Sequence, residues 1–422
     1  MPNNWKTYKL GEIIDYQKGY AFKSKWYQDS GKLIVRVSDT TSDSVDISTC
    51  HRISEENAKN LMQYELLEND IIIASVGSWP PNYNSVVGKV VKVPKSAQES
   101  LLNQNAVRLR TKDKKKFNQR FIYDVMKTHN FLNYIVNRAQ GSASQASIKL
   151  TDIFGYEFSL PPLQEQTQIA NILSAIDDKI ENNLATNKTL EDMAMALYKH
   201  WFVDFGPFQD GEFVDSELGL IPKGWEEKRL DDLAQILNSK RVPLSTGQRS
   251  NRKGKYPYYG ASGVIDNIDD FIFDGEYVII SEDGENLRSR KTPIGFSAIG
   301  KFWVNNHAHI LEGKQNGINK LIICHIAQMD MNPYLTGAVQ PKLNKSNLLS
   351  IGIAMPKEDS IIQEVLDEFY SISRLIFSNE KENQSLTKLR DTLLPKLING
   401  EVRLKEFREQ LENVIVRNEA IS

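Results

Sequence analysis

The sequence has little cysteine and no long apolar run. Its 422 residues include only Cys50 and Cys324, too few for a disulfide framework in a chain of this length. A membrane-spanning helix needs about 20 consecutive apolar residues, whereas runs such as residues 70–74 are the size of a strand. The first residues also lack the basic and then apolar pattern of a signal peptide. We therefore expect a cytoplasmic protein that does not contact a membrane.

Motifs for nucleotide hydrolysis and methyl transfer are also missing. The phosphate-binding pattern G-x-x-x-x-G-K-(S/T) does not occur. A DNA methyltransferase would need a glycine-rich turn after a strand and an (Asp/Asn)-Pro-Pro-(Tyr/Phe) loop. Asn332-Pro333-Tyr334 is one proline short, residues 79–83 (Trp-Pro-Pro-Asn-Tyr) lack the leading acceptor, and neither has the glycine-rich turn. A motif without its structural context is weak, so we expect no catalytic residue.

Metal-binding patterns have no more support. Cys50-His51 and Cys324-His325 are adjacent pairs, and neighbouring residues on a strand point to opposite faces, so each pair offers one ligand. His307 and His309 would share the face of a strand, but a zinc site needs further ligands. The acidic residues 282–285 have no lysine in their strand, which favours a turn over a nuclease site. We expect no metal and no cofactor.

Charge of one sign is not in excess. There are 52 Lys and Arg against 54 Asp and Glu, a formal net charge of −2. DNA binding requires Lys and Arg to neutralise phosphates, but a net charge summed over the chain can hide a basic face. Each local basic cluster, taken alone, is more typical of a solvated surface. The clusters are Lys112, Lys114, Lys115, Lys116 and Arg120; Arg249, Arg252, Lys253 and Lys255; and Arg288, Arg290 and Lys291.

What the chain does contain is an internal repeat, which in a long sequence is sought first. Residues 5–13 return as 225–233, and residues 102–109 return as 304–311. A third match pairs residues 141–145 and 149–150 with residues 337–340 and 342–343, so that Leu150 is matched to Leu343. Prolines then close each copy, at Pro161-Pro162 and at Pro356. Three pairs of matching segments in the same order are not a chance event, so the sequence predicts two copies of one unit.

A long amphipathic helix is predicted after each copy. Apolar residues recur there in alternating steps of three and four, the spacing of a heptad seam. Proline is tolerated in the first turn of a helix, Gly206 and Gly400 mark the ends, and Pro395 should kink or weaken the last turn of the second helix. Two such helices in one chain are expected to pair antiparallel. The seams comprise Ile169, Leu173, Ile176, Ile180, Leu190, Ala194, Leu197 and Trp201, and Ile362, Leu366, Phe369, Ile372, Ile376, Leu386, Leu393 and Leu397.

Asparagine interrupts both seams at matching positions. Asn183 and Asn187 lie in the middle of the first seam, and Asn379 and Asn383 lie in the middle of the second. Asparagine in a seam lowers stability but can fix the register of a helix pair and its partner. The alternative is that the middle of each helix is simply exposed to solvent. We favour a role in register because both seams share the feature.

The globular halves are predicted to mix helices with strands. Strand patterns occur at 33–37, 71–74, 86–91, 277–280 and 295–299, and helix patterns occur at 118–137 and 318–329. The predicted class is α+β, with two mixed α/β domains separated by two long antiparallel coiled-coil helices in a pseudo-twofold tandem repeat. The expected parts are a first domain (1–160), a first long helix (161–205), a linker (206–224), a second domain (225–355), a second long helix (356–400) and a C-terminal tail (401–422).

Several segments resemble the specificity subunits of type I restriction–modification systems. Residues 160–170, Leu-Pro-Pro-Leu-Gln-Glu-Gln-Thr-Gln-Ile-Ala, are similar to the start of the central conserved region of that family, and the likeness continues through 197–205, Leu-Tyr-Lys-His-Trp-Phe-Val-Asp-Phe. Residues 219–225, Gly-Leu-Ile-Pro-Lys-Gly-Trp, resemble the opening of the second recognition domain. The segment from Pro356 onward resembles the second conserved region of the family. The match is looser there, because Lys357-Glu358-Asp359 stands where the first copy of the repeat has Pro162-Leu163-Gln164. The resemblance covers essentially the whole chain.

The resemblance implies a non-catalytic subunit that serves in phage defence. Residues 1–160 and 225–355 would be target-recognition domains, each reading one half of a split, asymmetric sequence in double-stranded DNA. The helices would set the spacing and dock two modification subunits, which methylate adenine with S-adenosylmethionine. Restriction subunits would add ATP-driven translocation and cleavage. Two alternatives stay open at this point: a methyltransferase with fused recognition domains, and a DNA-binding regulator that acts alone.

The resemblance gives no residue-level contacts, so we choose candidates by chemistry. Arginine and lysine can read guanine in the major groove, and asparagine and glutamine can read adenine; other contacts will reach phosphates, which position without specifying. Polar stretches between the predicted strands can supply such side chains. The candidates are Lys23, Lys25, Asn82, Tyr83, Ser142 and Gln145 in the first domain, and Arg249, Asn251, Arg252, Arg288, Arg290, Lys291, Gln340 and Lys342 in the second.

Overall fold

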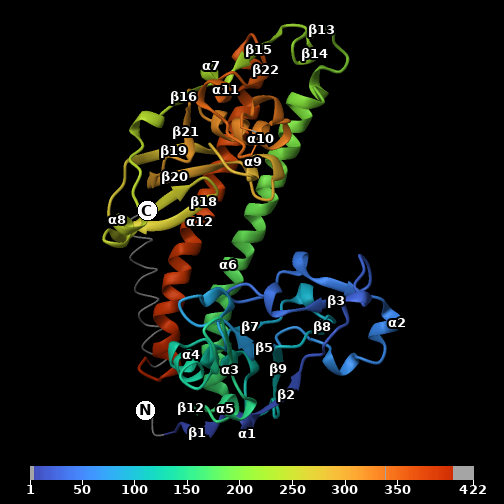
Figure 1. The fold of residues 1–422 in the computed structure, drawn as a ribbon, viewed down its shortest axis with the longest axis vertical. Helices are drawn as coiled ribbons and strands as arrows, with labels where there is room; N and C mark the ends of the chain where they lie inside the picture. The colour runs from blue at the N-terminus through green and yellow to red at the C-terminus, as the bar shows by residue number, and fades with distance from the viewer. Residues whose placement is uncertain (1–3, 338, 403–422) are drawn as a thin grey trace. The chain divides into compact units, whose positions relative to one another are not determined.

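The computed structural model describes residues 4–337 and 339–402 (Figure 1). Most of the expected C-terminal tail, residues 403–422, lies outside the described residues. The chain divides into two compact units, one of residues 1–180 with 385–422 and the other of residues 181–384. Both long helices therefore contribute one part to each unit. None of the helices in the described ranges is long and apolar enough to span a membrane.

The first unit is built around an antiparallel sheet in the order β2-β9-β5-β7. Three smaller sheets accompany it, in the orders β1-β12, β4-β3-β8 and β10-β11-β6. The strands are β1 (Lys6–Lys9), β2 (Ile14–Lys18), β3 (Lys32–Val35), β4 (His51–Ile53), β5 (Ile71–Ala74), β6 (Val76–Gly77), β7 (Val90–Lys92), β8 (Leu101–Leu102), β9 (Ala106–Thr111), β10 (Gln140–Ser142), β11 (Gln145–Ser147) and β12 (Glu157–Leu160). The short helices are α1 (Leu10–Ile13), α2 (Glu55–Ala58), α3 (Gln119–Met126), α4 (His129–Val136) and α5 (Leu150–Phe154).

The second unit contains a larger sheet in the order β16-β21-β19-β20-β17-β18, in which β17 and β20 are parallel. Two two-stranded antiparallel sheets complete it: β15-β22, whose strands lie far apart in sequence, and the hairpin β13-β14. The strands are β13 (Phe213–Ser216), β14 (Gly219–Pro222), β15 (Trp225–Arg229), β16 (Ala234–Ile236), β17 (Lys253–Gly260), β18 (Gly263–Ile268), β19 (Phe273–Ser281), β20 (Gly295–Val304), β21 (Ala308–Gly313) and β22 (Gly352–Pro356). The short helices are α7 (Leu230–Leu233), α8 (Thr246–Ser250), α9 (Asn286–Ser289), α10 (Ile318–Gln328) and α11 (Lys345–Leu349).

The repeat seen in the sequence is a repeat of structure. The order β2-β9-β5 in the first unit returns as β16-β21-β19 in the second. The ammonium of Lys112 donates to the carbonyls of Gly11 and Glu12, and the ammonium of Lys314 donates in the same way to those of Asp231 and Asp232. Shared topology and shared contacts identify the two domains as copies of one fold.

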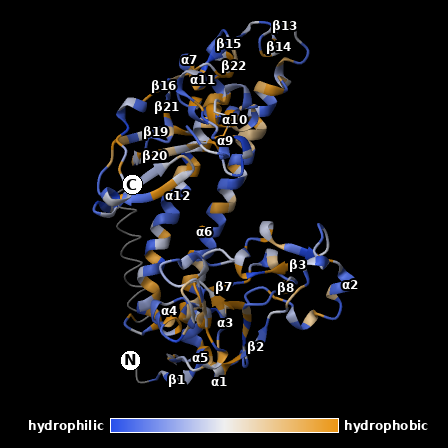
Figure 2. Cartoon of the chain, viewed as in Figure 1, coloured by the Kyte–Doolittle hydropathy of each residue, from blue (hydrophilic) through white to orange (hydrophobic). Residues whose placement is uncertain are grey.

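The two long helices are α6 (Leu163–Tyr198) and α12 (Gln363–Ile398). Figure 2 colours both as a mixture of hydrophobic and hydrophilic residues, as amphipathic helices should be. In the second unit Asn183 bonds to Asn383 and Asn187 bonds to Asn379. Rising numbers in α6 thus meet falling numbers in α12, so the helices pair antiparallel. This confirms the predicted α+β class with two mixed domains and two long antiparallel helices.

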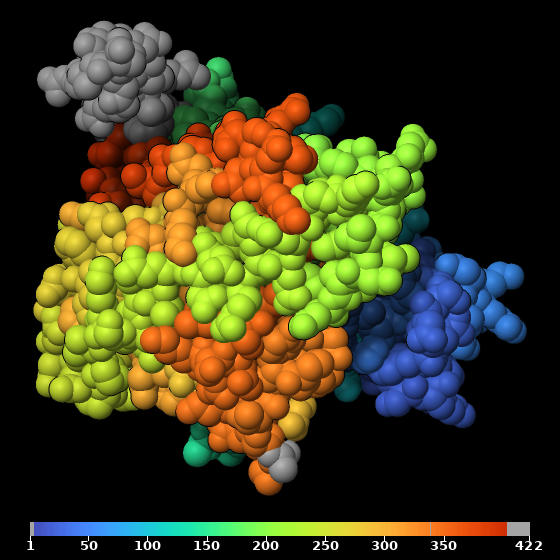
Figure 3. Space-filling model, turned by 90° about the horizontal axis from the view of Figure 1, so that it is seen from above, coloured from blue at the N-terminus to red at the C-terminus, as the bar shows by residue number. Residues whose placement is uncertain are grey.

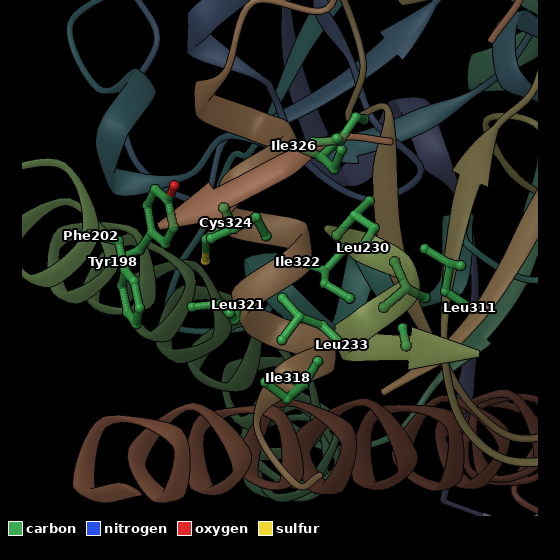
Figure 4. Packing of buried hydrophobic residues seen from close by; sticks show 14 of the residues in the cluster. Tyr198, Phe202, Leu230, Leu233, Leu311, Ile318, Leu321, Ile322, Cys324 and Ile326 are labelled. Carbon is green, nitrogen blue, oxygen red and sulfur yellow. The ribbon is translucent and has the colours of Figure 1, made fainter. Parts of the chain in front are cut away.

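Each unit has its own apolar core, to which the helices contribute. In the first unit Leu173 of α6 and Leu397 of α12 join the strands and α3. In the second unit the core packs α10 against residues from α6, α7 and β21 (Figure 4). Tyr198 and Phe202 approach α10 from the end of α6. The helix pair is therefore part of both hydrophobic cores rather than an appendage.

Three local predictions differ from the structure. The helix expected over 118–137 is two helices, because the side chain of Thr128 caps α4 by accepting from the Phe131 amide. The expected linker contains the hairpin β13-β14, which carries the exposed Leu220 and appears in green on one face of the second unit in Figure 3. Helix α12 begins only at Gln363, since Pro356 is the last residue of β22.

Candidate nucleic-acid interface

A loop and a hairpin meet on the surface of the first unit. The chain leaves the buried strand β5, and the carbonyl of Ser75 then accepts from the amide of Ile148 at 3.0 Å. Strand β6 pairs with β11, which forms a hairpin with β10. The indole Nε1 of Trp79 donates to the carbonyl of Ser142 at 2.8 Å and ties the loop to the hairpin. We call residues 78–85 and 140–147 the first loop–hairpin surface.

The second unit has the same arrangement after the corresponding strand, β19. The carbonyl of Glu282 accepts from the amide of Leu343 at 2.9 Å. The backbones of Asp283 and Lys342 pair as an isolated antiparallel β-bridge. The amide of Gly284 donates to the carbonyl of Pro341 at 3.0 Å. We call residues 282–292, with 336, 337 and 339–342, the second loop–hairpin surface.

The two surfaces correspond at the backbone hydrogen bonds that anchor them. Ser75 donates its amide to the carbonyl of Asn105 and accepts from Ile148; Glu282 does the same with His307 and Leu343. Ile148 therefore corresponds to Leu343, which corrects the sequence match of Leu150 to Leu343. Counting back three residues from each, Gln145 corresponds to Gln340.

Four of the six candidates in the first domain gather on the first loop–hairpin surface. Asn82, Tyr83, Ser142 and Gln145 are all exposed there. Lys23 and Lys25 lie on another segment, at the 3₁₀ turn Ser24–Trp26, where the ammonium of Lys23 is 5.6 Å from the ring centroid of Trp26.

Five of the eight candidates in the second domain gather on the second loop–hairpin surface. They are Arg288, Arg290, Lys291, Gln340 and Lys342, all exposed. Some already have intramolecular contacts. Arg288 donates to the carbonyl of Gly337 at 3.0 Å, Arg290 donates to the carbonyls of Ala327 and Met329 at the end of α10, and the ammonium of Lys342 is 3.5 Å from the Glu282 carboxylate.

The other three candidates lie on α8 and the turn after it. The guanidinium of Arg249 is 3.4 Å from Asp266 and donates to the carbonyl of Leu244 at 2.7 Å, and its side chain is only 16% exposed. Arg252 is 2.9 Å from Asp269. Asn251 is exposed. Arg249 and Arg252 are thus held by carboxylates of β18 and the residues that follow it, and their role in binding DNA stays a prediction.

A cavity of about 520 Å³ lies beside the first loop–hairpin surface and is lined by polar residues that the sequence did not single out. Lys18, Gln104, Asn105 and Lys149 line it together with Ser75. They come from segments far apart in the sequence, so no local pattern predicts that they line one cavity. The chain also presents Val339 at 95% exposure in the second surface, an apolar group of the kind that contacts thymine methyls.

The acid beneath the second surface stays ionised. Burial would raise the pKa of Glu282, but the hydrogen bond from Arg241 and the charges of His309, Arg241 and Lys342 outweigh burial and lower it. Burial lowers the pKa of His309, whose Nε2 lies 2.7 Å from the Leu343 carbonyl. Glu282 thus anchors the base of the hairpin.

The structure shows the surroundings of the two Cys-His pairs, Cys50-His51 and Cys324-His325. Burial raises the pKa of the Cys50 thiol and of the Cys324 thiol to about 12, so neither is a thiolate, the form that binds metals. The ring of His325 hydrogen-bonds to the Tyr198 hydroxyl. Within residues 4–337 and 339–402, no group of three or more His, Cys, Asp or Glu side chains is placed to hold a metal ion.

Two copies of one α/β domain, each followed by a long helix and each presenting an equivalent polar surface, define a two-module recognition protein. The model of the family described as "Type I restriction modification DNA specificity domain" matches residues 2–192 and 222–388. The chain belongs to this family, that of the specificity subunits of type I restriction–modification systems, and its function is recognition of DNA sequence.

Known relatives agree with this assignment. The chain is 30% identical over 315 residues to the type I restriction enzyme MjaIX specificity subunit of Methanocaldococcus jannaschii, covering 68% of this chain and 70% of that protein. It is 25% identical over 423 residues to the putative type I restriction enzyme MjaX specificity subunit of the same organism, covering 96% and 95%. The crystal structure of the S subunit of a type I restriction–modification system from M. genitalium shares the fold, with a TM-score of 0.56 and 18% identity over 94% of this chain and 97% of that chain.

Proposed function

We propose that each globular domain of this specificity subunit reads one half of a split, asymmetric sequence in double-stranded DNA. The observation that carries the proposal is the pair of corresponding loop–hairpin surfaces, one on each copy of the domain. Both copies expose polar side chains at the same place in one fold. Two similar surfaces with different side chains suit two different half-sites.

The two corresponding glutamines are the strongest candidates for base contacts. Gln145 and Gln340 correspond in the two hairpins and are both exposed. A glutamine amide can pair with N6 and N7 of adenine in the major groove. Around them, Asn82, Tyr83 and Ser142 would complete the first surface. Lysines such as Lys291 and Lys342 would contact phosphates, which fix the position of the protein without reading sequence.

The helices and the partners form the second part of the proposal. Helices α6 and α12 would set the spacing between the half-sites and dock two modification subunits, with restriction subunits joining them. The partners would supply adenine methylation with S-adenosylmethionine, ATP-driven translocation and cleavage, and this chain would supply none of that chemistry. Support comes from the family and from the relatives that are named specificity subunits of type I restriction enzymes.

Exchange of one domain tests the two-module proposal. Replacing residues 1–160 with the first domain of a relative should change one half-site and leave the other as it was. The modification complex would be reconstituted in cells, and the methylated sequence would be mapped by methylation-aware sequencing. If both half-sites changed together, the modules would not be independent and the proposal would be wrong.

Single substitutions test the two glutamines. Gln145→Ala and Gln340→Ala should each weaken binding to the specific site about ten- to hundredfold, since a good bidentate contact is worth about 1–3 kcal/mol. Each should relax specificity at one base pair of its own half-site. Binding would be measured on labelled duplexes at fixed salt, with the exposed Gln98→Ala and Gln328→Ala as matched controls. A uniform loss on specific and random DNA would instead assign the glutamines to phosphates.

A further inference from the structure

The cavity beside the first loop–hairpin surface lies where the segments of that surface begin and end. Ser75, which lines it, leads into β6 and then into the loop of residues 78–85. Lys149, another lining residue, comes two residues after the end of β11 in the hairpin. The wall also includes residues 18–19 at the end of β2 and residues 104–107 at the start of β9. The cavity therefore borders both the loop and the hairpin that are proposed to read bases.

The cavity carries positive charge without a compensating carboxylate. Lys18 and Lys149 line it, and both are exposed to solvent. Among the described residues of its lining there is no aspartate or glutamate. Within residues 4–337 and 339–402, neither ammonium group has an ion-pair or hydrogen-bond partner. Two uncompensated charges at one cavity attract an anion.

The other cations on and just after β9 are already used inside the fold. Arg110 is 2.5 Å from the carboxylate of Asp70. Arg108 donates to the backbone carbonyl of Glu65 at 2.7 Å. The ammonium of Lys112 donates to two backbone carbonyls of α1. The two cavity lysines have no such structural task, so their charges are available to a ligand.

Neutral donors lie next to the lysines. Gln104 and Asn105 form the turn that leads into β9, and Thr151 lies in α5; all three line the cavity and are exposed. In the part of the chain that the structure describes, none of these three side chains has a hydrogen-bond partner. Amides and hydroxyls of this kind accompany lysine and arginine in contacts to the phosphate oxygens of DNA. The set of donors is therefore suited to phosphate.

The spacing along the hairpin fits the dimensions of the major groove. Lys149 follows Gln145 by four residues, which is about 13 Å in an extended chain at about 3.3 Å per residue. The major groove of B-DNA is about 12 Å wide, and the phosphates of the two strands form its edges. A hairpin that places Gln145 at a base edge can therefore bring Lys149 to the phosphates beside that base.

The corresponding positions of the second unit carry asparagine. The hydrogen bonds that match the two surfaces put Asn344 in the place of Lys149. The pairing of β2 with β9, and of β16 with β21, puts Asn238 in the place of Lys18. Asn238 bonds to His309 of β21, and Asn344 caps α11. The shared fold does not need lysine at either place, so the pair of lysines is a special property of the first copy.

We propose that Lys18 and Lys149 bind phosphates of the DNA backbone at the mouth of this cavity, at the edge of the half-site that the first loop–hairpin surface reads. These contacts belong to the proposed recognition of a half-site by the first domain, on which the proposal rests. Each ammonium group neutralises phosphate charge and releases counterions. The two lysines thus strengthen binding to every sequence and fix the position of the hairpin, while the bases are read by other side chains.

The salt dependence of DNA binding tests the proposal, because it counts phosphate contacts. Lys18→Gln and Lys149→Gln each remove one charge, and binding of the reconstituted modification complex would be measured on specific and random duplexes. Each variant should reduce the slope of log affinity against log salt concentration by about 0.9, so that it loses about threefold less affinity than the wild type between 50 and 200 mM NaCl. Affinity for the specific and the random duplex should fall by the same factor, and the double variant should change the slope by about twice as much.

Two further variants serve as controls. Lys114 is an exposed lysine beyond the opposite end of β9, so Lys114→Gln should leave the slope unchanged. Lys149→Arg keeps the charge and should keep the slope. Neither cavity lysine has a partner to lose within the described residues, so the thermal midpoint of the unbound chain should be the same in all of these variants.

Three results would overturn the proposal. Unchanged slopes in both cavity variants would show that the lysines do not contact phosphates, and a loss confined to the specific duplex would assign them to bases. Saturable binding of pyrophosphate to the unbound chain, abolished by both substitutions, would make the cavity a site for a small anion. Half-site reading is tested separately by Gln145→Ala: if that variant kept its specificity while the lysine variants changed the slope, half-site reading by the hairpin would fail and the phosphate contacts would stand.

Discussion

At the scale of single residues, Asp124 shows burial outweighing a neighbouring charge. Its side chain is buried; one oxygen accepts from Arg120 at 3.0 Å, and the other has no partner among the described residues. Burial raises the pKa of Asp124 to about 7 despite the charge of Arg120. The nearby Asp43 behaves in the opposite way, because Lys127 and Arg390 outweigh its burial and lower its pKa. The first unit thus contains both a protonatable and a firmly ionised carboxyl.

This difference predicts a pH dependence of stability. The folded pKa of about 7 lies above the unfolded value of about 3.9, so between these pH values the folded state holds a proton that the unfolded state has released. The stability contributed by Asp124 is complete below about pH 4 and falls by up to about 1.4 kcal/mol per pH unit until pH 7. Asp124→Asn removes this slope, so its stability relative to the wild type should rise between pH 5 and 7 and stay level above pH 8.

Urea denaturation of both chains across this pH range would measure the effect. Asp178→Asn, at an exposed carboxyl on α6, is the matched control and should show no such change. A difference between Asp124→Asn and the wild type that stays constant from pH 5 to 8 would mean that Asp124 is ionised throughout.

At the scale of elements, the pairing of α6 and α12 depends on asparagines in an apolar seam. Asn183 is 2% exposed, and its amide donates to Asn383 at 2.9 Å and to Glu382 at 2.7 Å. The amide of Asn379 donates to Asn187 at 2.8 Å. Shifting one helix against the other would leave the buried amide of Asn183 without partners, at a cost of about 1–3 kcal/mol, and would separate the half-buried pair of Asn187 and Asn379. The pairs therefore favour one register.

A double-mutant cycle tests that role. Asn183→Leu alone should lower the free energy of unfolding by about 1–3 kcal/mol, because it leaves the Asn383 amide without its partner. Adding Asn383→Leu should recover most of the loss, since two leucines can pack in the seam. Thermal and urea unfolding would measure the four chains, with the exposed Asn182→Leu as control. Additive effects of the two substitutions would show that the asparagines do not act as a pair.

The elements that could be predicted from sequence are those set by local periodicity. The heptad spacing predicted both long helices, and the matching segments predicted two copies of one fold. The loop–hairpin surfaces could be predicted only in part. Their glycines and glutamines stand out in the sequence, but their assembly depends on hydrogen bonds among Ser75, Asn105 and Ile148, which lie far apart along the chain.

The ion-pair and hydrogen-bond partners of side chains also could not be predicted from the sequence. Arg249 and Arg252 are candidates because arginine can read guanine, yet in the structure Asp266 and Asp269 hold them. Ion pairs between α8 and residues on or after β18 cannot be read from composition. The break between α3 and α4 was missed for a related reason: Thr128 supplies a helix cap inside a stretch that is apolar enough to continue as one helix.

At the scale of the whole molecule, the helices are continuous from one unit into the other. Each has 36 residues, which at 1.5 Å per residue is about 54 Å of helix. If the helices act as the spacer in the proposed function, their length fixes the unread gap between the half-sites. The two asparagine pairs offer a place to change that length without changing the recognition domains.

Insertion of one heptad into each helix is the corresponding test. Placed near Leu184 and near Glu380, between the two asparagine pairs, matched insertions preserve the antiparallel seam because a heptad returns each apolar position to the same face. One heptad adds about 10.5 Å along each helix, and DNA rises 3.4 Å per base pair, so the gap should lengthen by up to about three base pairs. Bending of the DNA by tens of degrees costs only a few kcal/mol and can take up part of the added length, so the expected increase is one to three base pairs. The bases read at either end should not change.

Methylation mapping of the reconstituted complex measures both quantities, and a single-helix insertion, which breaks the seam, is the control that should abolish activity. An active double-insertion protein with an unaltered gap would show that the helix pair does not set the spacing.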